Sequence, residues 1–76
     1  MENLLKRIEI NSEVCHGKPV IKGTRMMVES ILEYMAGGSS VEDILESFPE
    51  LSKNDVLACI QFAIETMKNK SVVITD

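Results

Sequence analysis

The spacing of apolar residues changes near residue 26 of this 76-residue chain. Before that point, residues 6–10 alternate polar and apolar side chains, which is typical of a half-buried β-strand, and Pro19-Val20-Ile21 is typical of a second short strand. After it, the apolar side chains repeat as they do on one face of an α-helix; they are Val28, Ile31, Leu32 and Met35. The sequence therefore predicts a β-hairpin segment over residues 6–25 and a helix over residues 26–36.

Capping signals predict two further helices. Each begins after a serine that is followed, three residues later, by an acidic residue, the arrangement called a capping box. The candidate pairs are Ser39 or Ser40 with Glu42 or Asp43, and Ser52 with Asp55. Gly37-Gly38 ends the helix before the first pair, and Pro49 ends the helix between the two pairs because it disfavours the α conformation at Phe48. These signals place helices at residues 41–47 and 52–68.

The predicted fold is mainly α, with three helices after a short N-terminal β-hairpin in a single domain that spans residues 1–76. Two short capped helices joined by a tight turn, after an earlier helix, have the outline of a helix-turn-helix. A three-helix bundle with no role in nucleic-acid binding fits the same spacing equally well. Residues 69–76 form a tail whose β-prone sequence either pairs with a partner or frays.

The last predicted helix carries more apolar surface than one small core needs. A chain of this size buries only about 62% of its unfolded surface, so its stability is marginal and a partner is expected. The surplus lies at Leu57, Ile60 and Ile64, beside the inner apolar stripe of the helix. We therefore predict that these three residues form an interface and that the chain is a homodimer.

Charge is divided unevenly along the chain. Residues 1–25 carry five bases and three acids, whereas residues 26–66 carry one base and eight acids. Contacts with nucleic-acid phosphates are therefore expected from the N-terminal third, and Lys53 and Asn54 at the start of the last helix are the candidate base readers. The candidate DNA-binding residues are Lys18, Lys22, Arg25, Lys53 and Asn54. The acidic helices favour a basic partner, so protein binding is predicted ahead of DNA recognition.

The sequence also bears on location. No apolar run approaches the roughly 20 residues of a membrane span, and the first residues lack the apolar core of a signal peptide. Two cysteines, Cys15 and Cys59, are too few for a disulfide scaffold. A cytoplasmic protein with reduced thiols and no membrane partner is therefore expected.

Residues 16–25 form the sharpest local motif. Two glycines, three bases and a threonine before a helix are able to form an anion site, which makes a small phosphate- or nucleotide-binding protein or a hydrolase the alternative function. That function would use His16, Lys18, Thr24 and Arg25. In the structural interpretation, which we favour, Gly17 and Gly23 shape turns, Thr24 caps the helix and Arg25 pairs with an acid.

Catalytic and metal chemistry have little support in the sequence. His16 is the only histidine and has no evident titratable partner, and two cysteines and one histidine show no ligand spacing. We therefore predict a protein that is not an enzyme, with no catalytic residues, no metal and no cofactor.

Several segments together resemble one family of small prokaryotic proteins. The segments are Ile8-Glu9-Ile10-Asn11, then Val14-Cys15-His16-Gly17-Lys18-Pro19-Val20-Ile21-Lys22-Gly23-Thr24-Arg25 with Val28, and downstream Gly37 to Ile44-Leu45, Phe48-Pro49-Glu50-Leu51 and Asp55-Val56 through Ala63. They are similar to the domain of unknown function 433. The resemblance implies a homeodomain-like helix-turn-helix fold with an N-terminal hairpin. It also implies a regulatory role as an antitoxin, similar to the VapB-type antitoxins that accompany PIN-domain ribonuclease toxins.

Overall fold

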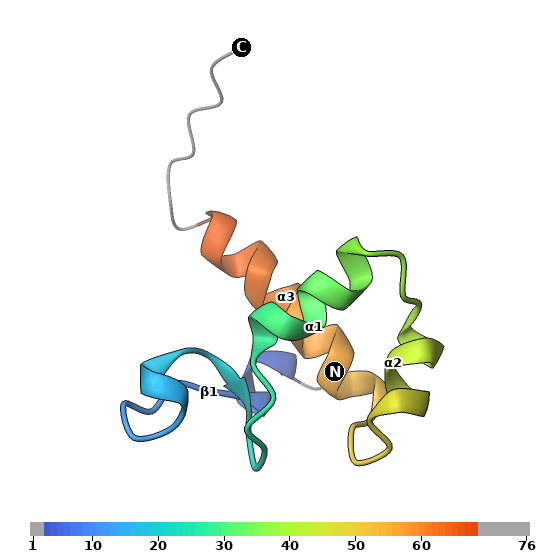
Figure 1. Ribbon diagram of the computed structural model, residues 1–76. Helices are drawn as coiled ribbons and strands as arrows, with labels where there is room; N and C mark the ends of the chain where they lie inside the picture. Colours follow the sequence, from blue (N-terminus) through green and yellow to red (C-terminus); the bar gives the residue numbers. More distant parts are fainter. Residues whose placement is uncertain (1–2, 69–76) are drawn as a thin grey trace.

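The computed structural model describes residues 3–68 and has three α-helices preceded by a two-stranded antiparallel hairpin. The elements are, in order, the 3-10 helix η1 (Leu4–Arg7), β1 (Ile8–Glu9), the 3-10 turn η2 (Cys15–Gly17), β2 (Val20–Ile21), α1 (Val28–Ala36), α2 (Val41–Ser47) and α3 (Lys53–Lys68). Helices α1 and α3 cross, and α2 lies beside the first part of α3 (Figure 1). The predicted fold class is confirmed. The predicted tail at 69–76 lies outside the described residues.

Strand β2 is bonded on both of its edges. On one side it pairs with β1, with Ile8 opposite Ile21. On the other side the Ile21 N–H donates to the Met26 carbonyl at 2.9 Å, and Val20 forms a bridge with Met27. The two methionines are therefore extended, and α1 begins at residue 28 instead of the predicted residue 26. The predicted strand at 6–10 is likewise shorter, because residues 4–7 form η1.

Both predicted capping boxes are present. The Asp43 N–H donates to Ser40 Oγ at 3.1 Å, and the Ser40 N–H donates to the Asp43 carboxylate at 2.9 Å. Ser52 and Asp55 make the same pair of bonds at the start of α3, at 2.9 and 3.2 Å. The Ser40 backbone N–H, and after it the Ser40 hydroxyl, lower the pKa of Asp43 below its usual 3.8. The sequence signals that place α2 and α3 are confirmed.

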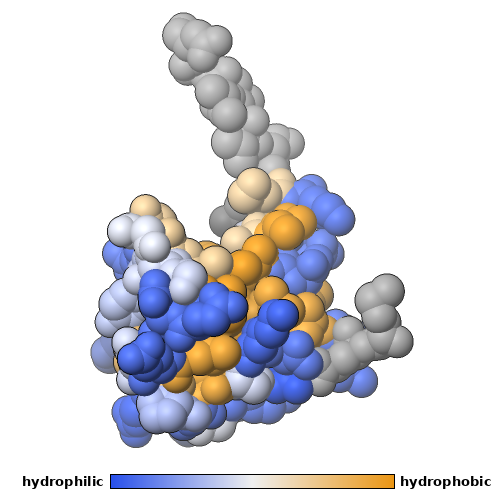
Figure 2. Space-filling view, turned by 90° about the vertical axis from the view of Figure 1, so that its right-hand side faces the viewer, coloured by the Kyte–Doolittle hydropathy of each residue, from blue (hydrophilic) through white to orange (hydrophobic). Residues whose placement is uncertain are grey.

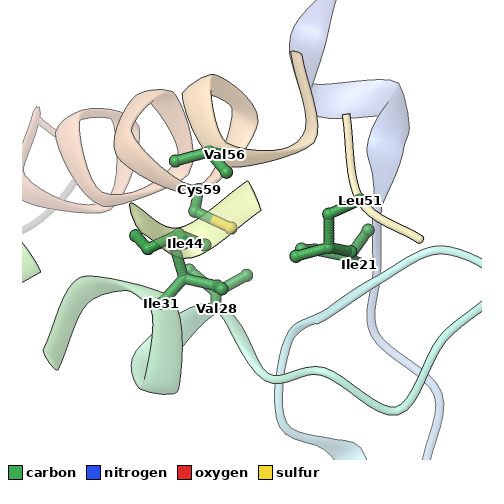
Figure 3. Close-up of a cluster of buried hydrophobic side chains, with 7 residues drawn as sticks. All are labelled: Ile21, Val28, Ile31, Ile44, Leu51, Val56 and Cys59. Atoms are coloured by element: carbon green, nitrogen blue, oxygen red, sulfur yellow. The ribbon is translucent and has the colours of Figure 1, made fainter. Parts of the chain in front are cut away.

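The core lies where α1, α2 and α3 meet the hairpin. Its buried side chains are Ile21, Val28, Ile31, Ile44, Leu51, Val56 and Cys59. Ile44 of α2 lies among the side chains of α1 and α3, while Leu51 packs on Ile21 at the base of the hairpin (Figure 3). The turn between α2 and α3 thus fixes the hairpin to the helices. No helix within the described range is long and apolar enough to cross a membrane.

The short helix η1 packs along α3 and joins the N-terminal segment to it. Its Arg7 donates to the Asp55 carboxylate at 3.0 Å, with 32% of the Arg7 side chain and 14% of the Asp55 side chain exposed. The same carboxylate completes the capping box of α3. The Asp55 carboxylate therefore accepts a backbone hydrogen bond at the start of α3 and also holds η1 in place through Arg7.

Candidate protein-interaction surface

An apolar groove lies between α1 and the second half of α3. Its volume is about 410 Å³, within the range of roughly 300–1,000 Å³ that ligand pockets occupy. It is lined by Pro19, Val28, Glu29, Leu32, Glu33, Ala36, Phe62, Ala63 and Thr66. We call this set the α1–α3 groove.

The groove exists because α3 is longer than the core that it helps to form. The buried residues of α3 are Val56, Ala58 and Cys59, all in its first half. In the second half, Ile64 is 40% exposed and Met67 is 65% exposed. Figure 2 shows hydrophobic surface rising along this side of the molecule toward the end of α3. An apolar helix face that its own chain leaves uncovered is a candidate for contact with a partner.

The predicted interface residues lie on the same helix, next to the groove. Leu57 and Ile60 are half-buried, and Ile64 is exposed. At about 100° per residue, these three side chains point to a different side of α3 from Phe62 and Ala63, which line the groove. The excess apolar surface of α3 is visible in the sequence, whereas the groove is not.

Acidic side chains form the rim of the groove on α1. Glu29 and Glu33 are one helical turn apart and both line it. The Lys18 ammonium lies 3.2 Å from the Glu29 carboxylate, and 57% of the lysine and 61% of the glutamate side chain are exposed. A pair so exposed contributes little to stability. Within the described residues Glu33 makes no ion pair.

The predicted DNA-binding residues do not gather at one place. Lys18 lies at the groove rim, whereas Lys53 and Asn54 are exposed in the first turn of α3. Lys22 approaches that turn through its backbone, because its N–H donates at 2.7 Å to the carbonyl of Arg7, which in turn binds Asp55. Arg25 is exposed in the loop before α1. Arg7 is the basic residue that the sequence analysis missed at this end of the molecule.

The position of η1 limits what α3 presents. In a helix-turn-helix the recognition helix lies in the DNA major groove, so one of its faces must be free of other protein contacts. Here η1 packs on α3, and Ala58 in the middle of the helix has no exposed surface. The second half of α3 exposes apolar side chains and lies beside an acidic rim, which favours contact with protein.

Residues 16–25 mostly have structural roles in turns and backbone hydrogen bonds. The Thr24 hydroxyl donates to the Ile21 carbonyl at 2.7 Å and accepts the Met26 N–H at 3.0 Å. The predicted cap of α1 by Thr24 is therefore wrong, since Met27 occupies that position with no side-chain bond. Gly23 supplies the predicted turn with a φ of 83°. An acid partner of Arg25 is not found within residues 3–68.

The turn η2 has an unusual backbone. Cys15, His16 and Gly17 have successive positive φ values of 50°, 57° and 81°. The left-handed conformation costs about 1–2 kcal/mol for each residue with a Cβ, so neighbouring bonds must hold it. The Lys18 N–H donates to the Cys15 carbonyl at 3.2 Å, and the Cys15 thiol donates to the Arg25 carbonyl at 3.6 Å. The turn is thereby tied to the loop before α1.

The titratable groups do not form a catalytic cluster. Burial, and after it the charge of Asp55, raise the pKa of the Cys59 thiol to about 12. Such a thiol stays protonated and belongs to the core. His16 is exposed, and no group of three or more His, Cys, Asp or Glu side chains able to hold a metal occurs in the described part of the chain.

Comparison with known proteins identifies the family. The model of a protein family of unknown function, DUF433, matches residues 8–63. The chain belongs to the DUF433 family. A crystal structure of a DUF433 member from Anabaena variabilis is similar, with a TM-score of 0.76 and 25% sequence identity over 83% of this chain. This chain spans 62% of the length of that protein. The sequence search finds no match among curated proteins.

The DUF433 match covers most of the groove. Residues 8–63 include all of α1 and reach Ala63 on α3. Thr66, which lines the groove, and the exposed Met67 lie beyond the matched region. The predicted resemblance is confirmed at the level of the family, whose function is unknown.

Proposed function

We propose that this DUF433 protein is a non-enzymatic interaction module of the antitoxin type, which binds a basic partner protein such as a PIN-domain-like ribonuclease toxin. The α1–α3 groove is the observation that carries the proposal. It is open and apolar, and the same half of α3 also exposes Ile64 and Met67, so the surface gains stability when another protein covers it.

Charge supports a basic partner. Residues 26–66, which include α1, α2 and most of α3, carry eight acids and one base. A ribonuclease that binds RNA phosphates needs a cationic active site, and an acidic surface of complementary shape accelerates association and covers that site. Inhibition would then follow from steric exclusion of RNA.

The proposal includes a homodimer formed through Leu57, Ile60 and Ile64. These residues are on the side of α3 next to the groove, so both surfaces are available in one molecule. A two-fold axis would place the same apolar patch of two copies together. We expect Ile64→Lys to give a monomer in sedimentation equilibrium while helicity is retained, because Ile64 is already exposed.

DNA binding ranks second and phosphate chemistry third. Lys22, Lys53 and Asn54 are exposed near the start of α3 and support weak contacts with DNA phosphates. For a phosphate site, the Lys18 ammonium already pairs with Glu29 and the Thr24 hydroxyl has two backbone partners. Protein binding therefore agrees better with the geometry.

The test begins with the full-length chain as bait in extract from its native cell. The captured protein is identified, purified and titrated against the chain by calorimetry, and its ribonuclease activity is measured with and without the chain. We expect one basic protein that binds stoichiometrically and loses activity. The proposal is wrong if no partner binds, if the partner is acidic, or if the only ligand found is DNA.

A further inference from the structure

We infer that the α1–α3 groove receives an amphipathic α-helix of its partner, with lysine or arginine residues one turn apart that face Glu29 and Glu33. The inference rests on the proposed function and adds the secondary structure and the charge pattern of the ligand. It follows from the walls of the groove, its length and its rim.

The walls favour a helix over an extended segment. Both long walls are α-helices, whose backbone groups bond within each helix. An extended segment over this apolar lining would bury its own N–H and C=O groups without partners. A helix satisfies those groups internally and presents only side chains. Helix-in-groove binding is thus the recognition mode that the walls allow.

The length of the groove sets the number of anchors. Its lining on α1 runs from Val28 to Ala36, which at a rise of 1.5 Å per residue spans about 12 Å, or two turns. Two turns of a docked helix bring apolar side chains at positions i, i+4 and i+7 onto the lining. The ligand helix therefore needs three apolar anchors on one face.

The rim sets the charge of the ligand. Glu29 and Glu33 lie side by side along the same edge, and the Lys18 ammonium already sits 3.2 Å from Glu29. That internal pair shows how a cation lies at the rim. A partner lysine or arginine can pair with Glu33 and a second can displace Lys18, which is held in a largely exposed pair. A second copy of this chain is a poorer occupant, because its residues 26–66 carry eight acids and one base.

A designed peptide tests the inference on the full-length chain. The probe is a labelled, end-blocked peptide of about 18 residues, long enough to be helical, with leucines at i, i+4 and i+7 and two lysines one turn apart beside them. A matched peptide has glutamate in place of the two lysines. Binding is measured by fluorescence anisotropy, and the site is located from the methyl resonances of Leu32 and Ala63.

Two variants and one control locate the site. Ala36→Arg fills the exposed end of the groove with a guanidinium group, and we expect at least about tenfold weaker binding. Glu33→Lys reverses the rim charge, and we expect about fivefold weaker binding of the lysine peptide. Glu46→Lys makes the same charge change on the exposed face of α2 and leaves the affinity unchanged. Circular dichroism establishes that all three variants keep their helicity.

Several results would overturn the inference. If the lysine and glutamate peptides bind equally well, the inferred preference for a cationic helix is wrong. If Ala36→Arg binds the lysine peptide with full affinity, the peptide does not bind in the groove. If the Leu32 and Ala63 resonances shift with protein concentration in the absence of peptide, a second copy of the chain occupies the groove. If the same resonances shift when residues 69–76 are deleted, the chain's own C-terminal residues occupy the groove.

The natural partner separates this inference from the proposed function. If the captured protein is a basic ribonuclease that the wild-type chain inhibits, but it binds Ala36→Arg normally, the partner class of the proposed function stands and the inference about the groove is wrong. If no protein is captured, the proposed function is wrong, whereas the peptide titration still decides whether the groove binds a cationic helix.

Discussion

The two halves of α3 share one helix but serve different parts of the molecule. The first half holds Val56, Ala58 and Cys59, whose side chains have no exposed surface, and its capping carboxylate is bound to Arg7. The second half has no buried residue, and Ile64 and Met67 face solvent. Sequence alone does not separate them, since both halves are rich in apolar residues. What differs is the chain packed against them.

The apolar contacts of this small domain are concentrated on the first half of α3. Helix α2 lies beside the first part of α3 (Figure 1), and the α3 side chains of the buried core all belong to its first half. Covering the rest would take another element, which the described residues lack. A partner supplies that missing layer in the proposed function. Substitutions that treat the two halves alike should therefore have unequal effects.

The largest contrast is expected between Val56→Asn and Met67→Asn. The first substitution removes core methyl groups and buries an amide without partners, and we expect it to lower the free energy of unfolding by about 3 kcal/mol. The second replaces a side chain that is 65% exposed, and we expect less than about 0.5 kcal/mol. Urea denaturation followed by circular dichroism measures both. Similar losses would mean that the second half of α3 is packed within the free chain.

A capping residue tests how the first half is held. Asp55→Ala removes both the capping bond to Ser52 and the ion pair with Arg7, and we expect a loss of about 2 kcal/mol. Asp43→Ala removes the equivalent capping bond of α2, which has no ion pair with an arginine among the residues that the structure describes, and we expect a smaller loss than for Asp55→Ala. Equal losses in the two variants would show that the ion pair with η1 contributes nothing.

The fold was predictable where a few local residues decide it. Ser40 with Asp43 and Ser52 with Asp55 set where helices begin, and Pro49 and Gly37 set where they end, so α2 and α3 were placed within one residue. The start of α1 was misplaced because Met26 and Met27 are held extended by bonds to β2. Such pairing joins separate segments and leaves no local signal. For the same reason η1 was taken for part of a strand.

The candidate site was only half predictable. The apolar excess of α3 is visible in the sequence at Ile60 and Ile64. The groove instead combines another side of α3 with Leu32 and Ala36 of α1, and the sequence of neither helix reveals the angle between them. The basic residues illustrate the same limit. Lys18 was grouped with DNA-binding residues by charge, whereas the structure places it beside Glu29 at the groove rim.

The burial of Cys59 in the first half of α3 makes the stability of the protein depend on pH in the alkaline range. Its pKa is raised to about 12 by burial, compared with 9.0 for an ordinary thiol, so the unfolded chain loses this proton first. The contribution of the thiol to stability is complete below pH 9 and is lost as the pH rises toward 12, by about 1 kcal/mol at pH 10. Denaturation at pH 8 to 11 should show a steeper decline for the wild type than for Cys59→Ala. Cys15→Ser should retain the wild-type slope, and a shallow slope in all three proteins would contradict the burial of Cys59.

The smallest effect is expected from Glu65, which supports the second half of α3 from within the helix. Its carboxylate accepts a hydrogen bond from Gln61 at 3.2 Å and lies 3.4 Å from the Lys68 ammonium. Pairs of this kind on a helix surface contribute about 0.2–0.5 kcal/mol, so Glu65→Ala should hardly change the global stability. Amide hydrogen exchange should nevertheless accelerate at residues 63–68 and stay unchanged at Val56 and Cys59, because the second half lacks a tertiary layer that would otherwise hold it. Addition of a partner that covers the α1–α3 groove should restore slow exchange in the variant. Faster exchange along the whole helix would instead show that α3 opens as one unit, and the contrast between its halves would then describe solvent exposure without a difference in local stability.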